Sequence, residues 1–363
     1  MSATILGIGT AMPPHTIAQD DAAELAKAFC CHTDEQARLL PMVYKRTHID
    51  RRGSVLLEEA KGSGLQQAFF APAVGDADSG PSTGQRMQRY AKDAAPLALA
   101  ASQRALAESQ LAAAQISHLI TVSCTGFVAP GVDIRLIKQL GLAETVDRTH
   151  IGFMGCHGAL NGLRVASALV NADLHARVLL CAVELCSLHF CYGWDSEKVV
   201  ANALFADGAA ALIAGPATRG SEDVWQVTAT GSCLFPDSED AMTWRIGDHG
   251  FEMTLSANIP VLLATHLRPW LERWLRLHDL TLKHIGSWAI HPGGPRLLSR
   301  VAACLDLSDQ ATAVSRDVLA GCGNMSSPTL LFILEHLRVA RASRPCVALG
   351  FGPGLVAEAA LFA

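Results

Sequence analysis

The sequence has few charged and few aromatic residues. Only 17% of its 363 residues are charged and 6% are aromatic, and the net charge is −5. This balance argues against attraction to nucleic acid or to an anionic membrane through overall charge. No apolar run approaches the roughly 18 residues of a membrane-spanning helix, and the first residues lack the basic segment of a secretion signal. We therefore expect a cytoplasmic protein with no membrane span and no nucleic-acid partner.

The chain also lacks the cysteine spacings of disulfide frameworks and zinc sites. Its eleven cysteines are odd in number, lie mostly inside apolar runs and include no CxxC pair. This pattern indicates reduced thiols rather than disulfides or metal ligands. We expect no metal and no bound cofactor.

What the sequence does have is a large apolar fraction, half of all residues. A chain of this length exceeds one simple core, so we expect two halves, residues 1–220 and 221–363. Strand-like apolar segments alternate with amphipathic helices in both, which predicts an α/β fold. A stretch rich in Pro, Gly, Asp and Ser, 71–84, is expected to be a surface loop. The expected strands include 4–8, 118–123, 177–183, 224–232, 285–290 and 346–350, and the expected helices include 156–172, 259–278, 295–305 and 327–343.

The second half repeats spacings of the first. His118 lies as far before Cys156 as His284 lies before Cys322, and each cysteine stands in a Gly-Cys turn that is expected to open a helix. A strand beginning near an arginine follows each turn at almost the same distance. This agreement predicts a duplicated βα unit, with the two helix-opening turns facing each other across a pseudo-twofold axis.

Cys156 is a candidate nucleophile. It stands in Gly155-Cys-His-Gly158, between the end of an apolar strand and an expected helix. Backbone N–H groups and the macrodipole at a helix start stabilise a thiolate. Taken alone, the segment fits a small buried cysteine at a tight turn equally well.

Two polar residues of the second half are predicted to reach the same pocket. His291 follows an expected strand and precedes a Pro-Gly-Gly turn, and ligands of α/β proteins bind at such strand ends. Asn324 precedes the helix that mirrors the Cys156 helix. Taken singly, the histidine also fits a surface turn and the asparagine also fits a helix cap.

Together the three residues indicate carbon–carbon bond formation. A thiolate can carry an acyl group, while an imidazole and a carboxamide can both donate to the oxygen of an enolate formed by decarboxylation of a malonyl thioester. Peptide hydrolysis by a papain-like Cys-His-Asn set is the nearest chemical alternative. It requires a histidine paired directly with the thiol, and the duplicated α/β plan argues against it.

The motifs around these residues resemble those of type III polyketide synthases, the chalcone-synthase-like branch of the thiolase superfamily. The resemblance covers essentially the whole chain and implies a thiolase-like layered αβαβα fold from two duplicated halves, in a homodimer. It implies that Cys156, His291 and Asn324 are catalytic. The motifs that carry it are Cys156, His291-Pro-Gly-Gly, Gly323-Asn-Met-Ser326, Leu204-Phe-Ala-Asp-Gly and Gly350-Phe-Gly-Pro-Gly-Leu355.

The same resemblance implies which residues bind substrate. Phe205 falls on the family's aromatic gatekeeper, and Met253 falls on a second gatekeeper that is phenylalanine in plant enzymes. Trp244, where chalcone synthases have glycine, lies in a stretch similar to that of bacterial members. The other implied substrate-binding residues are Cys124, Thr125, Cys186, His189, Ser326 and Gly352.

A basic loop is implied to lie near the phosphates of coenzyme A. Lys45 and Arg46 are the implied CoA-binding residues, whereas a solvated basic turn explains Arg51 and Arg52 equally well. The substrates would be acyl-CoA and malonyl-CoA, with no further cofactor.

The implied reaction loads an acyl group onto Cys156, extends it with decarboxylated malonyl units and cyclises the product. Small residues at Cys124, Cys186 and Ala129 favour an alkyl starter, as in microbial alkylpyrone and alkylresorcinol synthases. A cysteine at position 124 is equally typical of tetrahydroxynaphthalene synthases, which use malonyl units alone. The further alternatives are an initiating ketoacyl-ACP synthase, which carries a different asparagine motif, and a non-enzymatic acyl-binding scaffold, which has no need of all three catalytic residue types.

Overall fold

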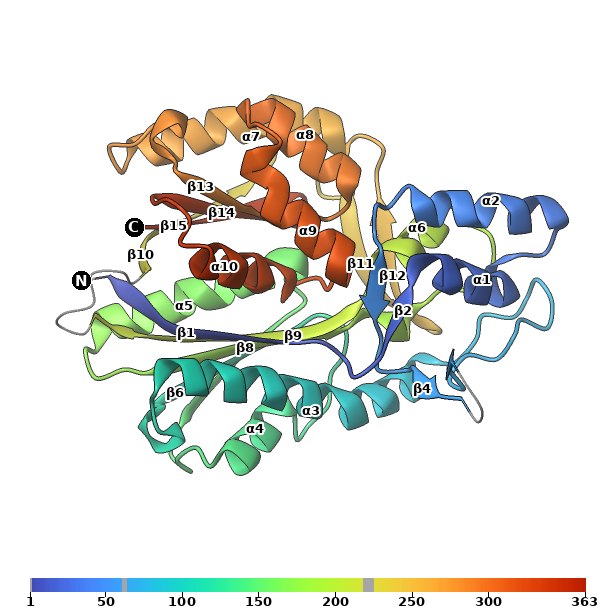
Figure 1. Cartoon of the computed structure of the whole chain (residues 1–363), viewed down its shortest axis with the longest axis horizontal. Helices are drawn as coiled ribbons and strands as arrows, with labels where there is room; N and C mark the ends of the chain where they lie inside the picture. The colour runs from blue at the N-terminus through green and yellow to red at the C-terminus, as the bar shows by residue number, and fades with distance from the viewer. Residues whose placement is uncertain (1, 61–63, 218–224) are drawn as a thin grey trace.

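One mixed sheet of nine strands, in the order β13-β14-β15-β10-β1-β9-β8-β6-β7, runs through the molecule. The computed structural model describes residues 2–60, 64–217 and 225–363. The sheet folds back on itself, so its two halves form two layers with helices between them and on both outer faces (Figure 1). Residue 224 of one predicted strand and the predicted boundary between residues 220 and 221 lie outside the described residues.

Each half contributes its own strands, and the two layers are joined where β1 pairs with β10 through Ala3↔Val227 and Thr4↔Gln226. The first half supplies β1 (Ala3–Ala11), β6 (His118–Ser123), β7 (Asp147–Gly152), β8 (Val178–Leu185) and β9 (Asp207–Pro216). The second half supplies β10 (Gln226–Leu234), β13 (Ser287–Ile290), β14 (Cys346–Gly352) and β15 (Val356–Phe362).

The helices form three layers around these strands (Figure 1). Helices α5 (Gly158–Ala172) and α10 (Thr329–Val339) lie between the strand layers. The first-half layer is covered by α3 (Thr83–Ser109) and α4 (Val132–Leu140), and the second by α7 (Ile259–Arg276) and α8 (Pro295–Leu305). This is the αβαβα order that the resemblance implied.

The remaining elements lie beside the layers. The helices are α1 (Gln19–Cys30), α2 (Asp34–Lys45), α6 (Ser196–Leu204) and α9 (Ala313–Cys322). The hairpins are β2 (Thr16–Ala18) with β3 (Arg51–Gly53), β4 (Glu58–Glu59) with β5 (Leu65–Gln66), and β11 (Met242–Gly247) with β12 (Gly250–Leu255). Short 3-10 helices are η1 (Ala113–Gln115), η2 (Gly155–His157), η3 (Cys186–His189), η4 (Leu282–His284) and η5 (Gln310–Thr312).

The apolar runs of the sequence become strands covered on both faces. All eight residues of β8 are buried, because α3 and α5 both pack against this strand. One apolar cluster fills the space between the strand layers, a second lies under α3 and a third lies under α7 and α8. Burial of these three clusters stabilises the layered arrangement.

Most predicted elements are found near their predicted positions. β6 and α8 have the predicted bounds, while β1 and β14 extend a few residues beyond theirs. The predicted loop 71–84 is correct as far as Ser82, which caps α3 through its side-chain oxygen.

The predicted role of Cys322 at a helix start is wrong. Cys322 is the last residue of α9, and the helix ends at Gly323, whose φ of +74° favours glycine. The residue before α10 that corresponds to Gly155 is Ser326: both have positive φ, +72° and +58°, and both precede their helix by the same number of positions. The counterpart of Cys156 in the second half is therefore Ser327.

Candidate active site

Cys156 lies at the start of α5, between the strand layers. It follows Gly155, where an added Cβ would lie 2.3 Å from Pro353 Cδ, so the backbone approach requires glycine. The thiol is buried, with 6% of the residue exposed. Ser326 Oγ donates a hydrogen bond to Cys156 Sγ at 3.5 Å. The predicted placement of a cysteine at a helix start is confirmed.

Burial controls the acidity of this thiol. It raises the pKa of Cys156 to about 11, and the carboxyl of Glu184 acts in the same direction, while the hydrogen bond from Ser326 lowers the pKa. Burial thus acts against the stabilisation of a thiolate that is expected from the helix start. The thiol is protonated at neutral pH and must lose its proton as it attacks a thioester.

His291 follows β13, and its backbone N–H donates to Leu349 O on β14 at 2.8 Å. Both of its ring nitrogens are buried, and neither has a hydrogen-bond partner within residues 2–60, 64–217 and 225–363. Burial, and then the neighbouring His157, lower the pKa of His291 to about 3. The imidazole is therefore neutral at pH 7, with one N–H and one lone pair free for a substrate.

Asn324 connects the turn after His291 to Cys156. Its Nδ2 donates to Gly293 O at 3.3 Å, and its Oδ1 accepts from the backbone N–H of Ser326 at 2.8 Å. Since Ser326 in turn bonds to the Cys156 sulfur, Asn324 and Cys156 belong to one hydrogen-bonded group, and Gly293 O joins this group to the turn after His291. Asn324 comes from the second half of the chain and Cys156 from the first.

A cavity begins at Cys156 and contains most of the implied substrate-binding residues. Pro353 lines it next to Gly352, which does not. The neighbours of Gly352 explain its identity, because an added Cβ would lie 2.5 Å from the His157 ring. His291 and Asn324 are likewise not among the lining residues. The implied residues that line the cavity are Cys124, Thr125, Cys186, His189, Phe205, Trp244, Met253 and Ser326.

Hydrogen bonds fix the aromatic wall of this cavity. His189 donates from Nε2 to Thr125 O at 2.7 Å and accepts at Nδ1 from Phe251 N at 2.9 Å. Its ring also stacks on Phe251 at 4.2 Å between centroids. Trp244 Nε1 donates to Cys124 O at 2.8 Å. With both ring nitrogens engaged, His189 acts as a wall and not as an acid or base.

Glu184 is a buried site residue that the sequence analysis missed. This carboxylate accepts from Cys124 N at 2.9 Å, Thr125 Oγ1 at 2.7 Å and Ser327 Oγ at 2.6 Å. Burial raises its pKa to about 7, and these hydrogen bonds partly oppose the rise. The sequence did contain a sign of this residue, because Glu184 is the one charged residue in the apolar run of β8. A glutamate is rarely fully buried unless it is paired with other polar groups.

Arg52 is half-buried and bonded to the protein, rather than part of a solvated basic turn. Its guanidinium lies 5.5 Å from the centroid of the Tyr44 ring. Nη1 donates to the backbone oxygens of Asn202 at 2.6 Å and Phe205 at 2.8 Å. Arg52 therefore positions the backbone at Phe205, the predicted gatekeeper, and it also lines the cavity.

A basic groove lies on the surface at the C-terminal end of α2. Its lining includes Arg46 and His48 from the first half and Arg296 and Arg300 from α8. These four side chains carry guanidinium or imidazole groups and are exposed. Lys45, the neighbour of Arg46, is also exposed but does not line the groove. Of the two implied CoA-binding residues, Arg46 alone is placed in a concave basic site.

All eleven cysteines are free thiols. Within the described part of the chain, no three His, Cys, Asp or Glu side chains are grouped closely enough to hold a metal ion. None of the helices described here has both the length and the apolar character needed to cross a bilayer.

Two family descriptions match consecutive parts of the chain. Residues 1–218 match chalcone and stilbene synthases, N-terminal domain. Residues 226–363 match chalcone and stilbene synthases, C-terminal domain. Together these matches cover nearly the whole sequence.

Individual polyketide synthases are also similar to this chain over nearly its whole length. The alpha-pyrone synthesis polyketide synthase-like Pks18 of Mycobacterium tuberculosis is 34% identical over 99% of this chain and 91% of its own length. The 1,3,6,8-tetrahydroxynaphthalene synthase of Streptomyces peucetius is 36% identical over 98% of this chain and 91% of its own. The crystal structure of PKS-I from the brown alga Ectocarpus siliculosus aligns with a TM-score of 0.92 and 31% identity, covering 99% of this chain and 98% of that one.

Proposed function

Since the chain belongs to the chalcone and stilbene synthase family of type III polyketide synthases, we propose that it loads a fatty-acyl group from acyl-CoA onto Cys156. The enzyme then extends this group with units from malonyl-CoA and cyclises the product to an alkylpyrone or alkylresorcinol. Family membership makes it a condensing acyltransferase; the starter, the product and the role of each residue are proposals.

The proposed chemistry begins with transfer of the acyl group. The Cys156 sulfur forms a thioester with the acyl carbon as CoA leaves, and the thiol proton goes to the departing CoA thiolate. Malonyl-CoA then loses CO2, and the electron pair of the broken C–C bond becomes an enolate. That enolate carbon attacks the Cys156 thioester and releases the cysteine thiolate, which recovers a proton.

The neutral, unpaired imidazole of His291 supports its assignment as a donor to the enolate oxygen. Asn324 Nδ2, now bonded to a backbone oxygen at the long distance of 3.3 Å, would be the second donor. Donors held in a buried, water-poor site stabilise a developing oxyanion strongly. No base is required to remove a carbon-bound proton, because decarboxylation forms the carbanion directly.

The lining of the cavity near Cys156 is the observation that favours an alkyl starter. Cys124 and Cys186 are small, and their thiols are buried with strongly raised pKa values, so they present neutral apolar groups. The name of the Mycobacterium relative refers to alpha-pyrone synthesis. A second candidate is an all-malonyl product, favoured by Cys124 and by the 36% identity to a tetrahydroxynaphthalene synthase.

The basic groove is the proposed site for the phosphates of CoA. Arg46 is the residue that the sequence already assigned to CoA binding. Arg296 and Arg300 of the second half line the same groove and would help to neutralise the negative charge of the phosphates. Guanidinium groups suit phosphate because their donors match its oxygens in pairs. Lys45 lies beside the groove and would contribute through its charge alone.

We also propose a homodimer formed around Ala129. Next to it, Phe127 and Val128 are 43% and 39% exposed, and Met154 is 38% exposed. A cluster of exposed apolar side chains is typical of an interface, and β7, the last strand of the sheet, lies at an open edge. Alanine at position 129 would let the partner intrude little into the cavity.

The eleven free thiols support a cytoplasmic location for the protein. The two halves that we propose from the sequence are residues 1–220 and 221–363.

The synthase proposal is tested with malonyl-CoA and a series of acyl-CoA starters of increasing chain length. We expect pyrones or resorcinols by mass spectrometry with the wild type, and complete loss of product and of protein acylation with Cys156→Ala. Cys322→Ala is the matched control, because it removes a cysteine that ends a helix, and it should retain activity. If the wild type neither releases CO2 from malonyl-CoA nor becomes acylated at Cys156, the proposal is wrong.

A further inference from the structure

The basic groove concentrates positive charge on an acidic protein. The chain has a net charge of −5, yet Arg46, His48, Arg296 and Arg300 line this one groove. Within residues 2–60, 64–217 and 225–363, the three arginines form no ion pair. Gathered cations without carboxylate partners repel one another and attract anions. The groove is therefore suited to a ligand that supplies several negative charges.

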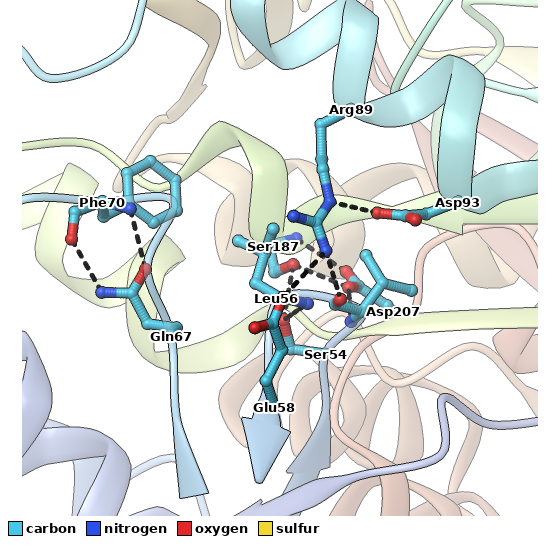
Figure 2. Close-up of polar contacts among 10 residues, drawn as sticks. Ser54, Leu56, Glu58, Gln67, Phe70, Arg89, Asp93, Ser187 and Asp207 are labelled. Carbon is cyan, nitrogen blue, oxygen red and sulfur yellow. Dashed lines mark hydrogen bonds and ion pairs between the residues drawn. The ribbon is translucent and has the colours of Figure 1, made fainter. Parts of the chain in front are cut away.

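Several arginines elsewhere in the molecule are paired with carboxylates of the chain itself. Figure 2 shows Arg89, whose Nε contacts the carboxylate of Asp93 and whose Nη2 lies 3.9 Å from Glu58 Oε1. Arg268 donates in the same way to Glu272 at 2.8 Å. Such pairs leave little charge for a partner, because each arginine is neutralised by its neighbour. The arginines of the groove keep their charge for a group from outside the chain.

Exposed apolar side chains flank the groove. Met42, whose carbonyl oxygen accepts from the backbone N–H of Arg46 at 3.2 Å, is 51% exposed. Val261, which follows the groove residue Pro260 at the start of α7, is 55% exposed. Neither apolar side chain lines the groove itself, so binding of a phosphate does not explain them. A protein surface that offers carboxylates together with apolar side chains matches both the groove and its flanks.

The groove lies directly beside the turn that carries His291. Pro295 lines the groove and follows the His291-Pro-Gly-Gly turn without interruption. Gly294, the last residue of that turn, lies against Leu204, because an added Cβ would be 3.5 Å from Leu204 Cδ1. Leu204 precedes Phe205, the proposed gatekeeper. A partner that occupies the groove is therefore close to the proposed entrance of the cavity.

We propose that the groove, with Met42 and Val261 beside it, docks a small acidic carrier protein that holds the acyl group as a thioester on a phosphopantetheine arm. The inference rests on the proposed function, because Cys156 must take up the acyl group. The Cys156 sulfur bonds to the acyl carbon, the bond from that carbon to the sulfur of the arm breaks, and the thiol proton goes to the released sulfur. Opposite charge steers the carrier protein to the groove, and the two apolar side chains give it a contact that CoA does not make.

The experiment compares three donors of one decanoyl group with the full-length enzyme: the acyl carrier protein of bacterial fatty-acid synthesis, CoA, and phosphopantetheine without a protein. We expect kcat/KM for the carrier protein to exceed that for phosphopantetheine about tenfold at low salt, because the protein adds steering and contact.

A double variant, Met42→Gln with Val261→Thr, removes the apolar contact and keeps shape and charge. It should lower kcat/KM for the carrier protein about tenfold, because polar groups would be buried without partners, and change that for CoA less than twofold. The retained activity with decanoyl-CoA also shows that the variant is folded. Leu277→Gln changes a side chain that is 79% exposed at the other end of α7; it is the matched control and should leave all three donors unchanged.

Binding of the carrier protein without its arm separates docking of the protein from recognition of the arm. Calorimetry at low salt should detect this binding with the wild type, and Arg296→Glu with Arg300→Glu should abolish it. No binding by the wild type overturns the inference. Equal kcat/KM for the carrier protein and for phosphopantetheine, or equal losses for the carrier protein and CoA in the double variant, overturn it too. Extension of decanoyl-CoA in those cases leaves the synthase proposal standing, whereas a wild type that extends no donor and releases no CO2 contradicts the proposed function itself.

Discussion

The two halves of the chain build the same helix start and place different atoms there. In the first half, Gly155 with positive φ leads into α5, and Cys156 follows it; in the second, Ser326 with positive φ leads into α10, and Ser327 follows. The first position presents a sulfur to the cavity, whereas the second donates its hydroxyl to Glu184 at 2.6 Å. The repeated backbone is therefore a scaffold, and the chemistry depends on what each copy carries.

The strand ends differ in the same way. β6 is followed by Cys124 and Thr125, which line the cavity, while its counterpart β13 is followed by His291. The first half thus provides the acyl carrier and much of the wall, and the second provides the candidate oxyanion donors. Glu184 ties them together, because it accepts hydrogen bonds from residues of both.

The largest effect that would test this division comes from removing the donors of the second half. With His291→Ala or Asn324→Ala, we expect the release of CO2 from malonyl-CoA to fall about 10²- to 10³-fold, as for the loss of one oxyanion donor. Acylation of Cys156 by a starter should fall less. Both steps are measurable on the same sample, CO2 with labelled malonyl-CoA and acylation by protein mass spectrometry.

His284→Ala removes an exposed histidine of the same half and serves as the control for the loss of an imidazole. Equal losses of decarboxylation and acylation in the His291 and Asn324 variants would show that the two halves do not divide the reaction as proposed. Each variant should elute and melt like the wild type before its rates are compared.

Local signals predicted the alternation of strands and helices, and the resemblance implied their layered order. The apolar run of β8 predicted a strand covered on both faces, and the Pro-Gly-Gly turn marked the strand end at His291. The resemblance supplied the cavity walls, and eight of its nine residues line the cavity. Local signals and the resemblance both work best for residues that lie within or next to a recognisable motif.

Properties that depend on distant contacts could not be predicted in this way. Cys322 matched the spacing of Cys156, but a glycine with positive φ can end a helix as well as precede one. The sequence alone suggests that Arg52 is a surface cation. In the structure, its guanidinium lies over the Tyr44 ring and donates to the carbonyl oxygen of Phe205. The raised pKa of the Cys156 thiol likewise follows from burial by both halves, which a local helix-start argument omits.

A smaller effect tests the acidity of the thiol. Burial raises the pKa of Cys156 from 9.0 to about 11, so the thiolate fraction at pH 7 is very small and grows with pH. The rate of alkylation of Cys156 by iodoacetamide should therefore rise about tenfold per pH unit between pH 7 and 9. Peptide mass spectrometry after timed quenching gives this rate. Ser326→Ala removes the one side-chain hydrogen bond that lowers this pKa and should therefore slow the alkylation several-fold. If the alkylation rate of the wild type is instead constant from pH 6 to 8, the helix start stabilises the thiolate in spite of burial.

The smallest effect concerns the basic groove, where the two halves meet at the surface. Arg46 lines the groove beside Arg296 and Arg300, whereas Lys45 does not. We expect Arg46→Ala to raise the KM for acyl-CoA about three- to tenfold and Lys45→Ala to raise it less than twofold, because exposed charges act weakly unless they contact the phosphate directly. The KM for the same acyl group on N-acetylcysteamine, which has no phosphate, should not change in either variant. Added salt should reduce the difference between Arg46→Ala and the wild type. If both variants raise the KM equally, overall charge rather than the groove attracts CoA; if the phosphate-free thioester is affected too, Arg46 acts on the fold of α2 and not on the ligand.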